Sequence, residues 1–553
     1  MKIKTKLSLI AIVLLAFFLR AYKTGKVPPA LNWDEVSIGY NSYSILKTGR
    51  DEWGKLLPLH FRAFGEYKLP GQIYLSIPGI WIFGLNEVGV RITPAIYGTI
   101  TVLLTFFLSK EIFKKDKTAL VSALLLAISP WHIQLTRASL ESSLGMGLVV
   151  SGLLFFLKGL EKNKYLYLSA VFFGLSIYTY NAERVFSPLF LLYLFFIFRT
   201  KLFSKKRFKK TIIAGLIFSL FVLRLAPTFF NNEAQSRYKL VSLLDDPGFV
   251  LRINEARGEL DLPEPLPRLV HNKATRFVWQ FGSNFVAHFS PNYLFIAGAG
   301  HHQHHVQGIG ELYYIEAPLL LAGLYFLFKK STNQTKKMFI GWIILAAIPV
   351  SITFDSIPHA LRNLVVLPSY QLLSGFGFVC LADLLGKKKA WLKYGFISLS
   401  AIVLIIQFSH YLKLYFIDYP VKYSQDWQYG YKQVMEYVSQ NQDKYDRVII
   451  TRHFGEPHIF TLFWLKYPPK KYQNSDNLVR FQSYDWVWVT QFDKYLFPDL
   501  GDPGTAVDDF RSQFQDKGKT LIIGRPGDFD AKDPVLLKVN FLNGDDAFMI
   551  SEF

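Results

Sequence analysis

Eleven hydrophobic runs constrain the fold of this 553-residue chain more than any other feature. Each run is near the ~20 residues that an α-helix needs to cross a hydrocarbon layer of ~30 Å. The composition agrees, because 51% of the residues are hydrophobic and 16% are aromatic, which is too apolar for a solvated multidomain enzyme. We therefore predict a polytopic α-helical membrane protein with about 11 transmembrane helices. The runs cover 7–22, 88–109, 118–133, 139–157, 165–180, 184–198, 211–227, 312–328, 338–354, 364–385 and 391–411.

Basic residues collect in six segments before or between these runs, as expected for cytoplasmic loops. The segments contain 25 Lys and Arg residues but only three acidic residues, whereas the whole chain has a net charge of +20. The excess of Lys and Arg therefore reflects the topology of the chain in the membrane. Because the excess lies in these loops, it argues against nucleic acid as a partner. The segments are 2–6, 110–117, 158–164, 199–210, 329–337 and 387–393.

A cytoplasmic N-terminus and an odd number of spans place the C-terminus outside the cytoplasm, in a multi-pass protein of the cell membrane. The first run lacks a small-residue cleavage site, which favours a retained anchor over a removed signal peptide. Two long loops, 23–87 and 228–311, fall on the outer side and are expected to cover an active site there.

The chain divides into residues 1–411, which form the transmembrane part, and residues 412–553, where hydropathy falls sharply. Short β-rich runs alternate with helix-like stretches in this tail, which predicts a small extracytoplasmic α/β domain. Strands are expected at 447–451, 486–490 and 520–524, and helices at 425–440 and 457–465. Cys380 is the single cysteine, so the chain has no intramolecular disulfide.

Two adjacent carboxylates, Asp34 and Glu35, follow directly on the first hydrophobic run. Acids at the mouth of a helical bundle can be partly desolvated and ready for proton chemistry, whereas acids at mid-bilayer would indicate ion transport. The same loop contains Lys68 before Pro70, and then the apolar stretch 73–85, which predicts an interfacial helix or a re-entrant turn. This arrangement favours a membrane enzyme.

The order of these short motifs is similar to the GT-C superfamily of membrane glycosyltransferases. Within it, the chain most resembles the protein O-mannosyltransferase and lipid A aminoarabinose transferase group. The resemblance covers residues 1–411 and rests on the carboxylate pair, the Lys68-Leu69-Pro70 element, Ser129-Pro130 with Arg137 and Glu141, and Arg362-Asn363 before Leu367-Pro368. It implies inverting transfer of a sugar from a polyprenyl-phosphate-linked donor to a protein, glycan or lipid acceptor on the outer face.

Inverting transfer needs a base on the acceptor hydroxyl, and Asp34 is our candidate for it. The alternative for Asp34 is a helix N-cap at the membrane surface. Glu35 either orients Asp34 or the acceptor, or is a solvated loop residue. Glu141 lies four residues after Arg137, which on a helix permits a salt bridge, and the resemblance places an acid at this position in the catalytic cavity. Asp34, Glu35 and Glu141 are thus the predicted catalytic residues.

A departing phosphate needs a fixed cation, and Lys68 is the first candidate. Its alternative role is nonspecific contact with lipid headgroups. Arg137 and Arg362, at outward helix ends, are expected to complete a phosphate clamp. The alternative is that the side chain of either arginine simply extends to the membrane interface. Glu66, Tyr67 and Tyr313 are predicted substrate contacts.

The tract from His301 to His305 contains four of the chain's 12 histidines. It predicts a divalent-metal site that includes His302 and His304, together with Asp34 or Glu66, although zinc sites usually take ligands from separated positions. A polar loop that contacts donor or acceptor, and an incidental solvated loop, are the alternatives. A transporter or flippase, and an oligosaccharide ligase that uses a polyprenyl-linked donor, remain the alternative functions.

Overall fold

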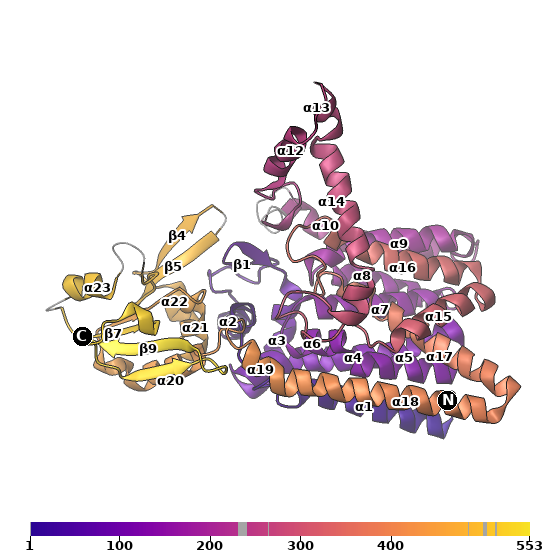
Figure 1. Ribbon diagram of the computed structural model, residues 1–553, viewed down its shortest axis with the longest axis horizontal. Coiled ribbons are helices and arrows are strands. Elements are labelled where there is room, and N and C mark those ends of the chain that lie inside the picture. The colour runs from indigo at the N-terminus through magenta and orange to yellow at the C-terminus, as the bar shows by residue number, and fades with distance from the viewer. Residues whose placement is uncertain (1, 230–239, 264, 485, 502–505, 515–516) are drawn as a thin grey trace. The chain divides into compact units, whose positions relative to one another are not determined.

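A computed structural model of the chain describes residues 2–229, 240–263, 265–484, 486–501, 506–514 and 517–553 (Figure 1). Part of the predicted loop 228–311, residues 230–239 and 264, lies outside the described residues. The chain forms two compact units. The first comprises Met1–Tyr22, Pro94–Thr136 and Glu141–Leu412, and the second comprises Lys23–Thr93, Arg137–Leu140 and Lys413–Phe553.

The first unit is helical. Ten of the eleven predicted hydrophobic runs each coincide with one main helix, and the run 118–133 is divided between two, because an apolar segment in lipid must satisfy its own backbone hydrogen bonds. Its elements are α1 (Ile3–Ala21), most of α4 (Glu87–Phe113), α5 (Asp116–Ile128), α6 (Pro130–Arg137), α7 (Ser142–Gly159), α8 (Tyr165–Ser176), α9 (Asn181–Leu202), α10 (Phe208–Phe229), α12 (Phe249–Gly258), α13 (Leu266–Val270), α14 (Lys273–Ala287), η1 (Asn292–Ile296), α15 (Glu316–Lys330), α16 (Asn333–Ser351), η2 (Leu364–Val366), α17 (Ser369–Lys388) and α18 (Ala390–Lys413).

Six helices within the described residues are long and apolar enough to cross a membrane, or seven if the bent pair α5 and α6 forms one span. The predicted number of eleven is therefore not confirmed. The run at 118–133 breaks by 55° at Pro130, because proline cannot continue the hydrogen bonding of the preceding helix. Other predicted spans are short as helices; α8 has 12 residues and α15 has 15.

Close packing in this unit depends on small residues. Helices α15 and α17 pack along their length, and Gly323 of α15 lies against the backbone of Leu373 in α17. Gly377 of α17 lies against the backbone of Leu319 in the same way. Small residues allow helix backbones to approach closely, which is the usual basis of helix association in membranes.

The second unit is α/β. Its elements are α2 (Trp33–Thr48), β1 (Phe61–Ala63), β2 (Glu66–Lys68), α3 (Pro70–Phe83), η3 (Leu414–Asp418), α19 (Tyr419–Lys422), α20 (Tyr431–Asn441), η4 (Gln442–Lys444), β3 (Arg447–Ile450), α21 (Pro457–Trp464), α22 (Pro469–Gln473), β4 (Val479–Ser483), β5 (Trp486–Phe492), β6 (Tyr495–Leu496), α23 (Val507–Phe514), β7 (Thr520–Gly524), η5 (Pro526–Asp528), β8 (Leu537–Asn540) and β9 (Asp546–Glu552). The apolar stretch 73–85 is thus largely helical, in α3.

The sheet of this unit has seven strands among the described residues, in the order β4-β5-β6-β3-β7-β9-β8. The central strand β3 pairs in parallel with β6 and β7, and the other neighbours are antiparallel. The three strands expected from the sequence are the cores of β3, β5 and β7. Antiparallel partners such as β9 were not predicted, although Ala547–Ile550 is one apolar run.

Segment 23–93 shares a hydrophobic core with the C-terminal sheet. Helix α2 packs against α3, α21 and α22, which can be found near it in Figure 1. Val36 and Tyr40 of α2 are fully buried with Phe460 and Phe463 of α21. Gly39 permits this contact, because a Cβ there would lie 2.6 Å from the Phe463 ring. The predicted outer loop is therefore a folded part of the α/β unit.

Candidate functional site

The N-terminus of α2 positions the carboxylate pair. Asn32 caps this helix, because its side chain accepts a hydrogen bond of 2.9 Å from the Glu35 backbone N–H. Asp34 is therefore in the first turn of the helix rather than its N-cap. A carboxylate at this position is stabilised by the helix dipole. The Asp34 side chain is 31% exposed, so an incoming hydroxyl can reach it.

Lys68 contacts Asp34 across 34 residues of sequence. The β1–β2 hairpin carries Lys68 at its end, and the Nζ atom forms an ion pair with Asp34 Oδ1. Glu66 Oε1 lies 3.7 Å from the same Nζ atom. Only 2% of the Lys68 side chain is exposed, so this cation is held in place by its surroundings. The structure thus joins a reachable carboxylate to a buried ammonium group.

Tyr67 lies between Glu66 and Lys68 on β2, opposite Arg62 of β1. Successive side chains on a strand point to opposite faces, so Tyr67 points away from the face that Glu66 and Lys68 share. Its side chain is partly buried.

Glu35 has a different environment from Asp34. Its side chain is fully buried and forms two hydrogen bonds with Arg91, of 2.8 Å from Nε and 2.7 Å from Nη2. The same carboxylate accepts a 2.9 Å hydrogen bond from the backbone N–H of Ser139. Arg91 also donates to the carbonyl groups of Thr24, Pro28 and Ala30. Glu35 therefore joins three chain segments, and its carboxylate does not face an open site.

Arg137 belongs to the same unit and is also fully buried. Its Nη2 donates to the carbonyl of Val27 at 2.7 Å, and its Nε donates to the Tyr415 hydroxyl at 3.1 Å. The guanidinium lies 4.9 Å from the centre of the Phe416 ring. Arg137 therefore packs within the protein at the point where 137–140 joins the α/β unit.

The remaining predicted residues belong to the helical unit. Glu141 precedes α7, and because α6 ends at Arg137, the two residues are not on one helix as predicted. Arg362 binds the carboxylate of Asp355 at 2.9 Å and the Thr353 hydroxyl at 3.0 Å. Tyr313 is fully buried and donates its hydroxyl to the Ile128 carbonyl at 2.7 Å.

The histidine tract is organised by Glu311. His305 is buried, and its Nδ1 atom lies 3.1 Å from Glu311 Oε1. Burial opposes the charged form of this imidazole, but the Glu311 carboxylate outweighs it and raises the pKa of His305. The rings of His301 and His304 stack at 3.9 Å. No group of three or more His, Cys, Asp or Glu residues that could hold a metal ion occurs in the described ranges, and metal binding by His302 and His304 stays a prediction.

Sequence reasoning missed Glu52, which is buried in the same unit as Asp34. The Asn41 side chain accepts a 3.1 Å hydrogen bond from the Glu52 backbone N–H. Burial, and then the charge of Asp51, raise the pKa of the Glu52 carboxyl to about 8, although Arg480 and Lys68 oppose this. The carboxyl is thus mostly protonated at neutral pH, and Asp34 and Glu66 are the carboxylates that balance Lys68.

An aromatic group beside Asp34 was also missed. The Trp33 ring centre lies 5.7 Å from that of Phe64 and 6.1 Å from that of Trp486. The Trp486 indole donates a 2.6 Å hydrogen bond to Glu456. These residues are far apart in the sequence, so no local pattern marks them as a group.

Comparison with known proteins gives two matches in sequence. Residues 70–226 match the family model described as dolichyl-phosphate-mannose-protein mannosyltransferase. An uncharacterized protein of Aquifex aeolicus (strain VF5) is 30% identical over 126 residues, which are 23% of this chain and 23% of that protein. The chain therefore covers less than a quarter of this relative.

Solved structures match over most of the chain. ArnT from Cupriavidus metallidurans, bound to undecaprenyl phosphate, aligns with a TM-score of 0.54 and 13% identity over 99% of this chain and 97% of its own. The oligosaccharyltransferase AglB from Archaeoglobus fulgidus, in complex with an inhibitory peptide and a dolichol-phosphate, aligns with a TM-score of 0.51 and 14% identity. This second alignment covers 84% of this chain and 64% of AglB. At these identities the likeness is one of fold.

Proposed function

We propose that this chain, which has the fold of the GT-C membrane glycosyltransferases, transfers a sugar from a polyprenyl-phosphate-linked donor to an acceptor on the outer face of the cell membrane. The observation that carries the proposal is the contact between Asp34, which is 31% exposed, and the buried Lys68. The contact joins a base for the acceptor to a cation for the leaving phosphate.

The reaction that fits this pair is a single displacement with inversion. The acceptor oxygen forms a bond with the anomeric carbon while the bond from that carbon to the phosphate oxygen breaks. The acceptor's proton passes to the Asp34 carboxylate, which acts as general base. The polyprenyl phosphate leaves with the electron pair of the broken bond, and Lys68 stabilises the additional negative charge.

The backbone around Lys68 suits this role. Pro70 is the first residue of α3, so the chain turns directly from strand β2 into a helix after Lys68. A buried ammonium on a rigid turn loses little conformational freedom when a phosphate binds. In the absence of donor, Asp34 and Glu66 neutralise it, and the phosphate would replace Glu66, which is the more distant partner.

The donor class is supported by the molecules bound in the two structural neighbours, since undecaprenyl phosphate and dolichol-phosphate are both polyprenyl phosphates. We propose Glu66 as a substrate contact beside Lys68, and Tyr67 as a substrate contact on the opposite face of β2. Arg137, which lies in the same unit as Lys68, is proposed to add positive potential for the phosphate from its buried position. Arg362 as a phosphate contact, Glu141 as a catalytic acid and Tyr313 as a substrate contact stay predictions. Glu35 is proposed to position the 137–140 segment through the Ser139 backbone.

The test is turnover by purified protein in lipid, supplied with polyprenyl-phosphate sugars and assayed for released polyprenyl phosphate. We expect Asp34→Asn and Lys68→Ala each to reduce turnover by about 10²-fold or more. This value is the lower end of the reduction that is typical when a general base or a charge-stabilising group is removed. Lys538 and Asp546 form an exposed 2.7 Å ion pair on the sheet, so Asp546→Asn and Lys538→Ala are matched controls. Unchanged turnover in Asp34→Asn and Lys68→Ala would remove these assignments.

Two further measurements separate the proposal from its alternatives. Proton NMR of the product should show an anomeric configuration opposite to that of the donor. Solute accumulation in proteoliposomes without cleavage of the carrier would instead indicate a transporter, and transfer of an intact oligosaccharide would indicate a ligase.

A further inference from the structure

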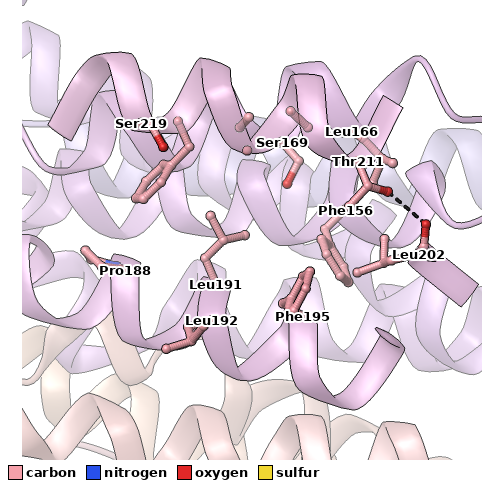
Figure 2. Close-up of a pocket in the computed structure, with 14 residues that line it drawn as sticks. Phe156, Leu166, Ser169, Pro188, Leu191, Leu192, Phe195, Leu202, Thr211 and Ser219 are labelled. Atoms are coloured by element: carbon pink, nitrogen blue, oxygen red, sulfur yellow. Dashed lines mark hydrogen bonds between the residues drawn. The ribbon is translucent and has the colours of Figure 1, made fainter. Parts of the chain in front are cut away.

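An apolar slot of about 390 Å³ lies between α8, α9 and α10, and Phe156 of α7 also lines it (Figure 2). Leu191, Leu192 and Phe195 of α9 line one wall, and none of the described residues that line the slot is charged. Two of its hydroxyl groups already donate within the protein. Thr211 donates to the Leu202 carbonyl at 3.1 Å, and Ser169 donates to the Gly152 carbonyl at 2.8 Å.

The slot is suited to a hydrocarbon chain. A buried water needs two to four polar partners, and these walls offer few. Helices α9 and α10 are both long and apolar enough to span a membrane, and only 11% of the most apolar part of α10 is buried within the protein. The slot thus borders a surface that faces lipid tails. Its volume is within the range of about 300–1,000 Å³ that is typical of ligand sites.

One end of the slot is beside a cluster of cations. Leu202 and Thr211 line this end. The basic turn 205–210 between them contains Lys205, Lys206 and Arg207 before α10, and Lys209 and Lys210 at the start of α10. Segment 158–164, which covers the end of α7 and the turn to α8, adds three lysines and one acid, Glu161. Basic pockets between membrane helices are suited to anionic lipid headgroups.

Asn163 fixes the two basic turns to each other. Its side-chain oxygen accepts a 3.0 Å hydrogen bond from Arg207 Nε, and its side-chain nitrogen donates to the Lys206 carbonyl at 3.1 Å. The cations at the end of the slot are therefore held by a defined structure rather than by two independent loops.

We infer that this slot binds an anionic phospholipid, with one acyl chain between α9 and α10 and the phosphate against the basic turn 205–210. The slot is distinct from Glu141, the predicted catalytic residue in the same unit. Glu141 precedes the start of α7, whereas Phe156 is 14 residues further along the same helix, a distance of about 21 Å at 1.5 Å per residue. The inference does not depend on glycosyl transfer.

Gly215 of α10 allows a direct test of the acyl-chain site. It lines the slot, and a Cβ added there would meet no atom within 4 Å, so a side chain can start from this position and Gly215→Phe adds a ring at the slot. Gly395 of α18 is also an exposed glycine with open space around it, but it does not line the slot. Gly395→Phe is therefore the matched control for helix propensity and surface hydrophobicity.

Delipidated full-length protein in detergent would be titrated with phosphatidylglycerol or phosphatidylcholine, and bound lipid counted by native mass spectrometry. We expect Gly215→Phe to weaken phosphatidylglycerol binding about tenfold, equal to about 1.4 kcal/mol, and Gly395→Phe to bind as the wild type does. Equal binding by the two variants would overturn the inference.

The headgroup is tested separately with Lys209→Gln/Lys210→Gln. We expect this variant to lose its preference for phosphatidylglycerol over phosphatidylcholine, and the preference of the wild type to weaken at high salt because exposed charges are screened. A preference that survives both changes would contradict the assigned phosphate site. Competition by polyprenyl phosphate at equal or higher affinity would contradict the assigned occupant.

Discussion

Asp34 and Glu35 are neighbours in the chain, but their carboxylates have different roles in the structure. Asp34 is partly exposed and pairs with Lys68, whereas Glu35 is buried against Arg91 and the Ser139 backbone. Consecutive residues on a helix point about 100° apart, so the capping of α2 at Asn32 decides which carboxylate faces outward. The chemistry of the pair therefore depends on where one helix begins.

Glu35→Gln is expected to destabilise the protein by about 3–5 kcal/mol, because it leaves the buried Arg91 guanidinium without a counter-charge. Thermal unfolding in detergent measures this loss. The control is Glu87→Gln, which removes a 2.6 Å pair with the 40%-exposed Lys432 and should cost about 1 kcal/mol or less. Asp34→Asn should retain most of the stability, since an amide oxygen and Glu66 remain near Lys68. Equal stability of Glu35→Gln and wild type would contradict the structural role of Glu35.

Glu52 makes stability dependent on pH. Its pKa is about 8 in the folded protein and 4.5 when solvated, so the folded state holds the proton more tightly. The stability that this group contributes is complete below pH 4.5 and is lost as pH rises to about 8. The shift corresponds to an upper limit of about 5 kcal/mol. Between pH 4.5 and about 8, the melting temperature of Glu52→Gln should fall less with rising pH than that of the wild type. An equal fall in both proteins would refute the assignment.

At the scale of elements, the β1–β2 hairpin brings Lys68 to α2. The hairpin is held against the C-terminal sheet, because the Phe64 carbonyl accepts a 3.2 Å hydrogen bond from the Val487 N–H. Gly65 lies at the same contact, where a Cβ would be 2.5 Å from the Trp486 ring. The position of the cation therefore depends on a sheet that begins more than 350 residues later in the chain.

Gly65→Ala is expected to force the hairpin away from Trp486, at a cost of about 1–3 kcal/mol, and to lower turnover by moving Lys68. Gly527→Ala is the control, because a Cβ there meets no atom within 4 Å. Both variants would be measured for melting temperature and for release of polyprenyl phosphate. If Gly65→Ala behaves like Gly527→Ala, the hairpin does not control the site.

Most single elements could be predicted from the sequence. Apolar length identified a helix for each of the eleven runs and for the stretch 73–85, and β-rich composition identified β3, β5 and β7. The salt bridge that one helix would permit between Arg137 and Glu141 has no such helix to form on, because α6 ends at Arg137 and α7 begins at Ser142. Apolar runs show where a helix forms but give little information about its last residue.

At the scale of the whole molecule, the resemblance to the GT-C superfamily is confirmed by the match to residues 70–226 and by the fold shared with ArnT and AglB. A mostly helical fold with several helices that are long and apolar enough to cross a membrane, and with a C-terminal sheet, is also confirmed. The side of the membrane on which each part lies stays a prediction from the distribution of Lys and Arg.

Cysteine labelling tests this topology, since Cys380 is the single native cysteine and is buried. In a Cys380→Ala background, we expect Lys532→Cys to react with a membrane-impermeant maleimide added to intact cells. We expect Lys206→Cys to react only after the membrane is permeabilised, because basic loops remain cytoplasmic. Labelling of both positions from the same side would contradict the proposed orientation.

The sequence by itself determined the helical membrane architecture, the α/β tail and the residue types available for transfer, because these depend on local hydropathy and short motifs. The tertiary structure decided which carboxylate pairs with Lys68, which arginines are buried among protein partners, and that segment 23–93 shares a core with the C-terminal sheet. These properties result from contacts between residues that are tens to hundreds of positions apart. No local pattern in the chain encodes such contacts, so they follow only from the packing of the folded protein.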